Sequence, residues 1–456
     1  MENPSQTYFD EKLESILNCV FLKRNIILHG PGGVGKSYTL RHIAKALKEQ
    51  NVRVFITALT GVAALTLAGN NNVNGIPVST LHSFAGVGTA QLDADALITR
   101  VKSKGTALKK WLKCQVLIID EVSMMGGSFF SKLDKIAKAV RKNDKPFGGI
   151  QLIFSGDMLQ LPPVKDTWAF NTEEWRALEL RPFILEVPYR YSDPEFFQML
   201  LRIRVGEQNE NDYKTIRSRV RANKKMQDIL SSLSTEKAGE IIKPTMFFSR
   251  RVDVDAYNAM ELEKLSGEKI EFIAFDRFEI KRGSPIREEY IKILDDSIPR
   301  SIFFKVGAQV MLKTNIDVNA GLVNGSRGVV SEIIKDEALI VKFLSGVKIR
   351  IDLQTTDVED KHAIAKRTQI PFVLAWCSTI HKSQSSTLDY AVIDLGNSIF
   401  CEGQSYVALS RCSSIDGLFI SEFTQKSILI NKEALRYTNE LREKCTRENE
   451  FVTKNL

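Results

Sequence analysis

Eight consecutive residues near the N-terminus combine glycines with a lysine and a serine in a spacing suited to phosphate binding. In a G-x-x-x-x-G-K-S loop, backbone N–H groups surround phosphate oxygens, the lysine neutralises the β- and γ-phosphates, and the serine hydroxyl ligates magnesium. We therefore predict an ATP site with Mg²⁺, in which Lys36 is catalytic and Ser37 binds the metal. The predicted nucleotide-binding residues are Gly30, Pro31, Gly32, Gly33, Val34, Gly35, Lys36 and Ser37.

An acidic pair supplies the second half of such a site. The apolar run at 116–119 ends in Asp120 and Glu121. Asp120 is placed to join the magnesium shell, and Glu121 to polarise the attacking water as a general base. Gln160 follows another apolar run and is a candidate sensor of the γ-phosphate or its water; the alternative is an ordinary loop glutamine.

Two arginines that follow the apolar run at 150–154, Arg190 and Arg411, are candidate catalytic cations. An arginine brought to the γ-phosphate from another domain stabilises transition-state charge and couples hydrolysis to domain closure. Judged by position alone, each arginine is more commonly a surface ion-pair residue.

The elements that must position these residues follow an alternating pattern. Short apolar runs at 25–28, 52–58, 116–119 and 150–154 read as buried strands, and 38–49 reads as a helix. Strands of this kind joined by helices predict a doubly wound parallel sheet. A lysine-rich insertion at about 88–113 interrupts the pattern.

The second half alternates helix and strand again, in 183–258 and 367–422. Between these parts, β-type segments such as 308–312 and 338–341 are separated by glycines, which favours a small inserted barrel. From these boundaries we predict a first domain at 1–180, a second at 181–258 and 366–456, and a β-rich insertion at 259–365. The tail from Lys432 reads as a charged helix.

Composition narrows the function classes. The chain has 456 residues, of which 43% are hydrophobic and 26% charged, as in folded globular proteins. No apolar stretch is long enough for a membrane span, and the first residues resemble neither a secretory signal nor a transit peptide. The formal charge of +8 permits a polyanionic partner, and six cysteines without a C-x-x-C pair favour a reducing setting. We expect an intracellular location: nuclear, cytoplasmic or at a site of viral replication.

Several motifs together resemble the PIF family of DNA helicases, in the 5′-to-3′ branch of helicase superfamily one that also holds RecD-like relatives. Beside the phosphate loop these are DEVSM at 120–124, GDMLQLPPV at 156–164 and GQSYVALSR at 403–411. TLHSF at 80–84 and TIHKSQ at 379–384 also match. The matches follow the family order from about residue 25 to 415.

This resemblance implies an α/β fold of two RecA-like motor domains with ATP between them, a short wedge insertion in the first and a small β-barrel in the second. It implies an ATP-dependent helicase that translocates 5′ to 3′ on single-stranded DNA and unwinds duplex or forked DNA in replication, repair or recombination. It gives hydrolytic roles to the residues named above and a nucleotide contact to Gln404. The DNA-binding residues it implies are Thr60, His82, Phe84, Pro163, Thr379, His381 and Lys382.

The chain departs from the family pattern at three places. Ser385 replaces a glycine after Gln384, Tyr191 replaces a glutamine after Arg190, and upstream only Gln6 could be the glutamine that reads adenine. Base selectivity therefore stays open. The short ends of the chain would suit a compact motor core, viral or cellular, and we expect a monomer in isolation that replication or repair proteins can recruit.

Alternatives to these roles stay open. For His82 the alternative to DNA binding is a structural role, and for Phe84 it is packing in the core. Two basic runs, at 102–113 and 214–225, are more typical of solvated helix faces than of DNA contacts. The rival functions are an RNA helicase of the same superfamily and an ATPase switch that binds DNA without unwinding it; a simple P-loop kinase is disfavoured by the motifs beyond residue 180.

Overall fold

The fold is described from a computed structural model of the chain. The described residues are 4–68, 75–88, 90–232, 244–280, 291, 294–295, 298–314, 316–317, 322, 326–343, 346–359, 363–384, 387–388 and 390–454. Ser385, which replaces the family glycine, lies outside them.

The first α/β unit is built on a six-stranded sheet in the order β3-β2-β4-β5-β1-β6, with every described pair parallel. Its strands are β1 (Ile26–His29), β2 (Val54–Ala58), β3 (Val78–Thr80), β4 (Val116–Asp120), β5 (Gln151–Gly156) and β6 (Arg181–Ile184). Strands β1 and β4 are buried along their whole length, because helices cover both faces of the sheet. The predicted parallel sheet is confirmed.

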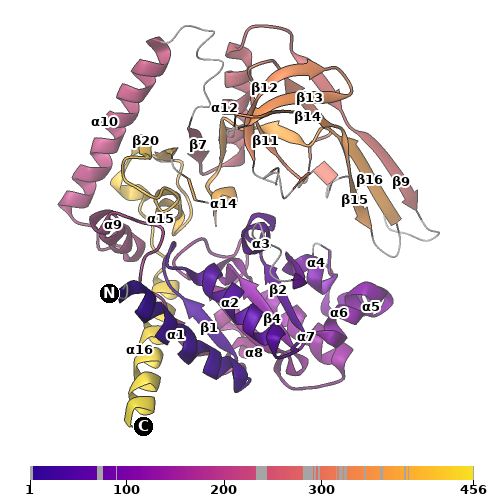
Figure 1. Ribbon diagram of the computed structural model, residues 1–456, viewed down its shortest axis with the longest axis vertical. Coiled ribbons are helices and arrows are strands. Elements are labelled where there is room, and N and C mark those ends of the chain that lie inside the picture. Colours follow the sequence, from indigo (N-terminus) through magenta and orange to yellow (C-terminus); the bar gives the residue numbers. More distant parts are fainter. Residues whose placement is uncertain are drawn as a thin grey trace.

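Helix α1 precedes the first strand of this unit, and the other helices lie between its strands in the chain (Figure 1). They are α1 (Pro4–Phe21), α2 (Lys36–Glu49), α3 (Gly61–Ala68), α4 (Leu81–Ala85), α5 (Ala94–Ser103), α6 (Gly105–Lys113), α7 (Gly127–Arg141) and α8 (Glu173–Arg176). The predicted insertion at 88–113 forms α5 and α6. Leu97, Val101 and Trp111 fix these helices to the unit because their side chains are fully buried in its core.

The second α/β unit has a four-stranded sheet in the order β18-β7-β19-β20, also parallel. Its strands are β7 (Thr245–Phe248), β18 (Cys377–Thr379), β19 (Ala391–Leu395) and β20 (Leu418–Phe423). Its helices are α9 (Pro194–Val205), α10 (Glu210–Ser232), α12 (Arg251–Lys264), α14 (Ile380–Ser383) and α15 (Gln404–Leu409).

Antiparallel sheets occupy the stretch between α12 and β18. The largest runs β14-β13-β12-β11-β17, and smaller sheets run β15-β16-β9 and β10-β8. The strands are β8 (Ile270–Ile273), β9 (Phe275–Ile280), β10 (Ser301–Phe304), β11 (Gln309–Leu312), β12 (Arg327–Ile334), β13 (Ala338–Phe343), β14 (Lys348–Asp352), β15 (Gln354–Glu359), β16 (Ala363–Gln369) and β17 (Phe372–Leu374). This antiparallel insertion has a separate hydrophobic core, centred on residues such as Phe304, Val310 and Phe372.

Strand pairing corrects the predicted domain boundaries. The boundary at 180/181 cuts the first sheet, because β6 is hydrogen-bonded to β1. The boundary at 258/259 cuts α12, which runs to Lys264, and the boundary at 365/366 cuts β16. The last strand of the insertion is β17, because its residues pair with β11.

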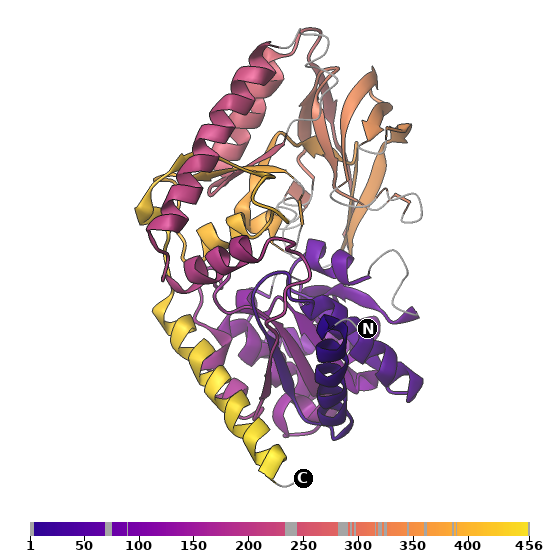
Figure 2. The ribbon, with the colours of Figure 1, turned by 60° about the vertical axis from the view of Figure 1, so that its left-hand side comes forward.

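The C-terminal helix α16 (Lys432–Lys454) departs from the predicted division more strongly. It was assigned to the second domain, but it lies against the first α/β unit, as Figure 2 shows. The Tyr437 ring stacks on Phe170 at a centroid distance of 4.1 Å, and its hydroxyl accepts a 2.9 Å hydrogen bond from Trp175 Nε1. Lys444 donates to the Leu180 carbonyl at 2.7 Å. Helix α16 therefore links the second unit to the first, because it follows β20 in the chain and packs on the first unit.

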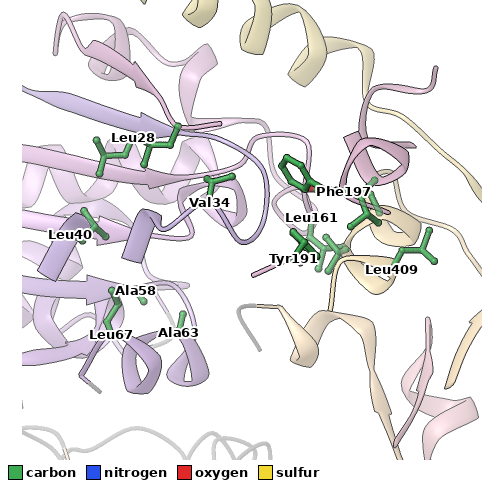
Figure 3. Close-up of a cluster of buried hydrophobic side chains, with 14 of the residues drawn as sticks. Leu28, Val34, Leu40, Ala58, Ala63, Leu67, Leu161, Tyr191, Phe197 and Leu409 are labelled. Carbon is green, nitrogen blue, oxygen red and sulfur yellow. The ribbon is translucent and has the colours of Figure 1, made fainter. Parts of the chain in front are cut away.

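One hydrophobic cluster passes between the two α/β units. Figure 3 shows Val34 of the phosphate loop and Leu161 near Tyr191, Phe197 and Leu409. All five side chains are buried. Separately, none of the described helices is long and apolar enough to cross a membrane.

Candidate nucleotide site and nucleic-acid interface

The phosphate loop connects β1 to α2 and is shaped by its glycines. Gly33 and Gly35 have φ angles of 84° and 81°, in the left-handed region that glycine adopts without a steric penalty. The Lys36 ammonium lies under the loop and donates to the carbonyls of Gly30 at 2.8 Å and Pro31 at 2.7 Å. Burial lowers the pKa of Lys36, while the nearby carboxylates of Asp157, Glu121 and Asp120 raise it.

The predicted metal ligands lie next to each other. The Ser37 hydroxyl donates to Asp120 Oδ2 at 3.1 Å, which joins the start of α2 to the end of β4. Burial, together with the charge of Glu121, raises the pKa of Asp120 to about 6. Oxygen ligands of this kind suit Mg²⁺, which is held by one or two protein groups plus substrate phosphates. In the described ranges, no group of three or more His, Cys, Asp or Glu could hold a metal ion.

The predicted base, Glu121, contacts the second unit through a residue that sequence reasoning did not assign. Gln384 follows α14, and its amide Nε2 donates to Glu121 Oε2 at 2.9 Å. Gln160 is also buried, and its amide is 3.5 Å from Asp157 Oδ2. Within the described residues, the Oε1 atoms of both glutamines are buried and lack a hydrogen-bond donor. Each of these unused acceptors suits a water molecule, which has hydrogens to donate.

Both candidate arginines lie at the phosphate loop. A β-carbon built on Gly32 would be 3.5 Å from Arg411 Nη2 and 3.7 Å from Arg190 Nη1. Arg190 donates to the Ser410 carbonyl at 2.9 Å, and Arg411 to the Val407 carbonyl at 2.7 Å. Burial and the charge of Arg190 lower the pKa of Arg411 to about 10. Two cations held this close to a phosphate-binding backbone indicate an anionic ligand.

The α15 segment reaches the loop through Tyr406, not through Gln404. The Gln404 amide is fully buried, accepts hydrogen bonds from the backbone N–H groups of Phe400 and Cys401, and donates to the Ser249 carbonyl. In this structure the polar atoms of Gln404 are used within the second unit, and its nucleotide contact stays a prediction. Instead, the Tyr406 hydroxyl accepts a hydrogen bond from Gly32 N at 3.0 Å.

A buried ion pair lies behind the site. Arg204 of α9 makes hydrogen bonds of 2.7 to 3.1 Å to both oxygens of Asp157, and its Nη2 is 3.2 Å from His29 Nε2. Burial alone would raise the pKa of Asp157, but Arg204 lowers it to about 2. Burial, reinforced by the charge of Arg204, lowers the pKa of His29 to about 3. Sequence reasoning missed this pair because an arginine in an amphipathic helix carries no motif.

The predicted DNA-binding threonines close the ends of parallel strands. Thr60 follows β2 and accepts a hydrogen bond from Ala63 N at 3.1 Å, at the start of α3. Thr379 ends β18 and accepts from Lys382 N at 3.4 Å, at the start of α14. Helices α3 and α14 face each other across the two units in Figure 1. Carboxyl ends of parallel strands are where such sheets bind ligands.

Three other predicted DNA contacts are partly accessible. His82 is half-buried and stacks on Phe129 at 4.5 Å, and burial lowers its pKa. His381 is also half-buried, with its ring 6.3 Å from Phe400, which is 61% exposed. Lys382 is exposed.

Two predicted contacts are corrected. Phe84 is 0% exposed and packs between Phe55 and Trp111, so it serves the core and cannot stack on a base. Pro163 is buried, while its neighbour Val164 is 68% exposed, so Val164 presents this loop to solvent.

The class of protein is defined by two parallel sheets, a phosphate loop with its acidic pair, and arginines supplied from beyond β6. It is a P-loop nucleoside triphosphatase of two α/β units. Residues 4–179 match the PIF1-like helicase family, and residues 298–333 match the 2B domain of DNA helicase Pif1. The chain belongs to the PIF1-like helicase family.

Individual relatives agree with this placement. The chain is 34% identical to the ATP-dependent DNA helicase PIF1 of Xenopus laevis over 449 residues, which cover 96% of this chain and 65% of the relative. The crystal structure of the Pif1 helicase of Candida albicans has a TM-score of 0.78 and 32% identity, with 94% of this chain and 98% of that chain covered. A Bacteroides Pif1 bound to single-stranded DNA has a TM-score of 0.66 and 25% identity, with coverages of 94% and 96%.

These relatives confirm the predicted family and fold class. The chain spans about two thirds of the length of the curated relatives that it matches.

Proposed function

We propose that this protein is an ATP-dependent DNA helicase that translocates 5′ to 3′ on single-stranded DNA and unwinds duplex or forked DNA in genome replication, repair or recombination. The observation that carries the proposal is the composite nucleotide site. Arg190, Arg411 and Gln384 lie beyond β6, yet all three reach the phosphate loop or its general base. Hydrolysis at such a site depends on closure of the two units, which is what a translocating motor requires.

In the proposed reaction, Lys36 and the loop N–H groups hold the β- and γ-phosphates. Glu121 accepts a proton from the attacking water, whose oxygen bonds to the γ-phosphorus while the bond to the β-phosphate bridging oxygen breaks. Gln160 and Gln384 orient that water through their free acceptor atoms. Arg190 and Arg411 stabilise the charge that develops on the γ-phosphoryl oxygens.

Ser37 and Asp120 would hold Mg²⁺, which neutralises charge on the phosphates when it is bound. Two exposed aromatic side chains beside the phosphate loop offer faces on which a nucleotide base would stack. Tyr189 is 49% and Tyr38 47% exposed, and the Tyr189 ring lies against Gly35. Aromatic faces stack on any base, so this arrangement supports binding without strong base selectivity.

On the DNA side, we assign contacts to Thr60, His82, Thr379, His381 and Lys382. The coupling to ATP is short, because Lys382 and Gln384 belong to the same turn after β18. If this turn moves when DNA binds, the movement is passed to Glu121 through the hydrogen bond from Gln384. The DNA helicase names of the relatives support an intracellular site of action. In this proposal the protein acts as a monomer, and other replication or repair proteins can recruit it.

The test is ATP-dependent unwinding of DNA duplexes that carry either a 5′ or a 3′ single-stranded tail. We expect strand separation with the 5′ tail only, and none with Lys36→Ala at either tail. Separation with the 3′ tail only would contradict the polarity. DNA-stimulated hydrolysis without separation would favour an ATPase switch, and preference for RNA-tailed duplexes would favour an RNA helicase.

A further inference from the structure

A cavity of about 430 Å³ lies where the second α/β unit meets the antiparallel insertion. Its walls come from α12 on one side and from β10, β11 and β17 on the other, and the turn that holds Thr379 and Lys382 forms one end. The volume falls within the range of small-ligand sites, about 300–1,000 Å³. The nucleotide site is built from none of these lining residues.

The cavity combines apolar walls with clustered positive charge. Val254, Leu262, Ile302 and Met311 are among the lining side chains, so a flat apolar group could be enclosed. Lys313, which directly follows β11, lines the same cavity as Arg251 and Lys382. Burial, together with the positive charges of Lys382 and Arg251, lowers the pKa of the Lys313 ammonium.

Two carboxylates also line the cavity, and both have partners. Asp255 Oδ2 is 3.8 Å from Arg251 Nε, and Asp295 accepts a 2.5 Å hydrogen bond from Arg367. Arg251 is therefore partly neutralised, whereas the charges that act on Lys313 among the described residues are those of the cations Lys382 and Arg251. A half-buried ammonium beside two other cations is stabilised by an anion, and a phosphodiester supplies one.

From this arrangement we propose that the cavity binds one nucleotide of the translocating strand, with its base between α12 and β11 and its phosphate on Lys313. The proposal rests on the proposed DNA-binding function and deepens it. The site continues directly from Thr379 and Lys382, so a strand that contacts this turn reaches the cavity with the next nucleotide. It gives the antiparallel insertion a part in holding DNA, through Lys313 of its sheet.

The phosphate contact is tested with Lys313→Gln and the matched control Lys348→Gln. Lys348 is exposed on β14, at the far edge of the same sheet from β17. Binding of an oligothymidylate is measured over a series of salt concentrations. We expect Lys313→Gln to weaken binding about tenfold at low salt and to reduce the salt slope by about 0.7, the value for one phosphate on a single strand. The control should match the wild type.

The base contact is tested with Ala259→Trp, which fills the cavity from an exposed position of α12, and with Ala256→Trp as its control on the same helix. A single abasic site is moved along the oligonucleotide. In the wild type, one abasic position should lower affinity, and in Ala259→Trp that position should have no further effect.

The outcomes separate the two proposals. If the wild type binds and unwinds DNA while Lys313→Gln and Ala259→Trp bind with wild-type affinity and salt slope, the cavity is not a nucleotide site and the helicase function stands. If the wild type does not bind single-stranded DNA, both proposals fail. Thermal unfolding of each variant is the control for folding. If its midpoint is the same as in the wild type, a loss of binding is not caused by a loss of folding.

Discussion

The nucleotide site and the proposed DNA-binding surface are both built from loops that follow parallel strands. They differ in how far their side chains are buried by contacts with distant segments. At the nucleotide site, side chains from distant segments meet and are buried, as in the 2.9 Å hydrogen bond from Gln384 to Glu121. At the DNA-binding surface, Thr60 and Thr379 cap only their own helices. Chemistry on phosphate needs fixed charges away from water, whereas translocation needs contacts that form and break.

The largest effect should come from the arginines that make the nucleotide site composite. Arg411→Ala removes a buried cation 3.5 Å from the β-carbon position of Gly32, and we expect hydrolysis to fall by about a thousandfold. Arg190→Ala should cost about a hundredfold or more. Steady-state ATPase assays at saturating DNA measure both. If either variant kept wild-type hydrolysis, that arginine would have no catalytic role. Arg219→Ala is the control for the loss of structural hydrogen bonds, because Arg219 donates to the Leu418 and Asp416 carbonyls.

A second prediction concerns the single hydrogen bond that joins the two regions. Gln384→Ala should lower DNA-stimulated hydrolysis by about tenfold to a hundredfold, because Glu121 loses its donor from the turn that holds Lys382. Stimulation by DNA should fall more than hydrolysis without DNA. Gln384→Glu, which keeps the shape but places a second carboxylate beside Glu121, should be worse than Gln384→Ala. An equal loss with and without DNA would mean that Gln384 acts only in the chemical step.

A third prediction concerns the acid stability of the buried network behind the site. His29 has a pKa of about 3 when folded, against about 6.5 when unfolded, so the unfolded chain binds more protons between these values. Stability is therefore complete above pH 6.5 and falls as the pH drops toward 3, by about 2 kcal/mol at pH 5. Asp157, with a pKa of about 2, adds a further loss below about pH 4.

Urea unfolding at pH 7 and pH 5 measures the contribution of His29. His29→Gln removes the titrating group and should reduce the difference between the two pH values. A difference that stayed the same in this variant would assign it to other groups.

The smallest effect is expected from the basic run on α10. Lys214 and Arg221 are exposed, and Arg217 lies 5.9 Å over the Tyr213 ring. These charges belong to a solvated helix face, so Lys214→Gln with Arg221→Gln should change DNA affinity less than twofold and leave the salt slope unchanged. A slope reduced by about 0.7 or more would add α10 to the DNA-binding surface.

The local features of both regions could be predicted from the sequence. The phosphate loop and the strand that ends in Asp120 depend on residues within a few positions of each other, and backbone propensities act over that range. For the same reason, the run at 116–119 was recognisable as a strand. Apolar runs of this kind are buried on both faces only in sheets that helices cover.

The destination of individual side chains was decided by packing between segments far apart in the chain. Within the motif at 403–411, Gln404 bonds to Ser249 inside the second unit, while Tyr406 bonds to Gly32 of the phosphate loop. Gly403 packs against the Gln160 carbonyl, where a β-carbon would lie only 2.6 Å away. Phe84 entered the core because Trp111, on α6, encloses it.

The sequence by itself therefore determined the parallel sheets, the phosphate loop, the acidic pair and the family, since these follow from short-range patterns. Only the tertiary structure decided that Gln384 contacts Glu121, that Arg204 neutralises Asp157, and that α16 returns to the first unit. Each of these contacts joins residues at least 47 positions apart. No local pattern encodes them, because their energy is gained only when both segments are already folded.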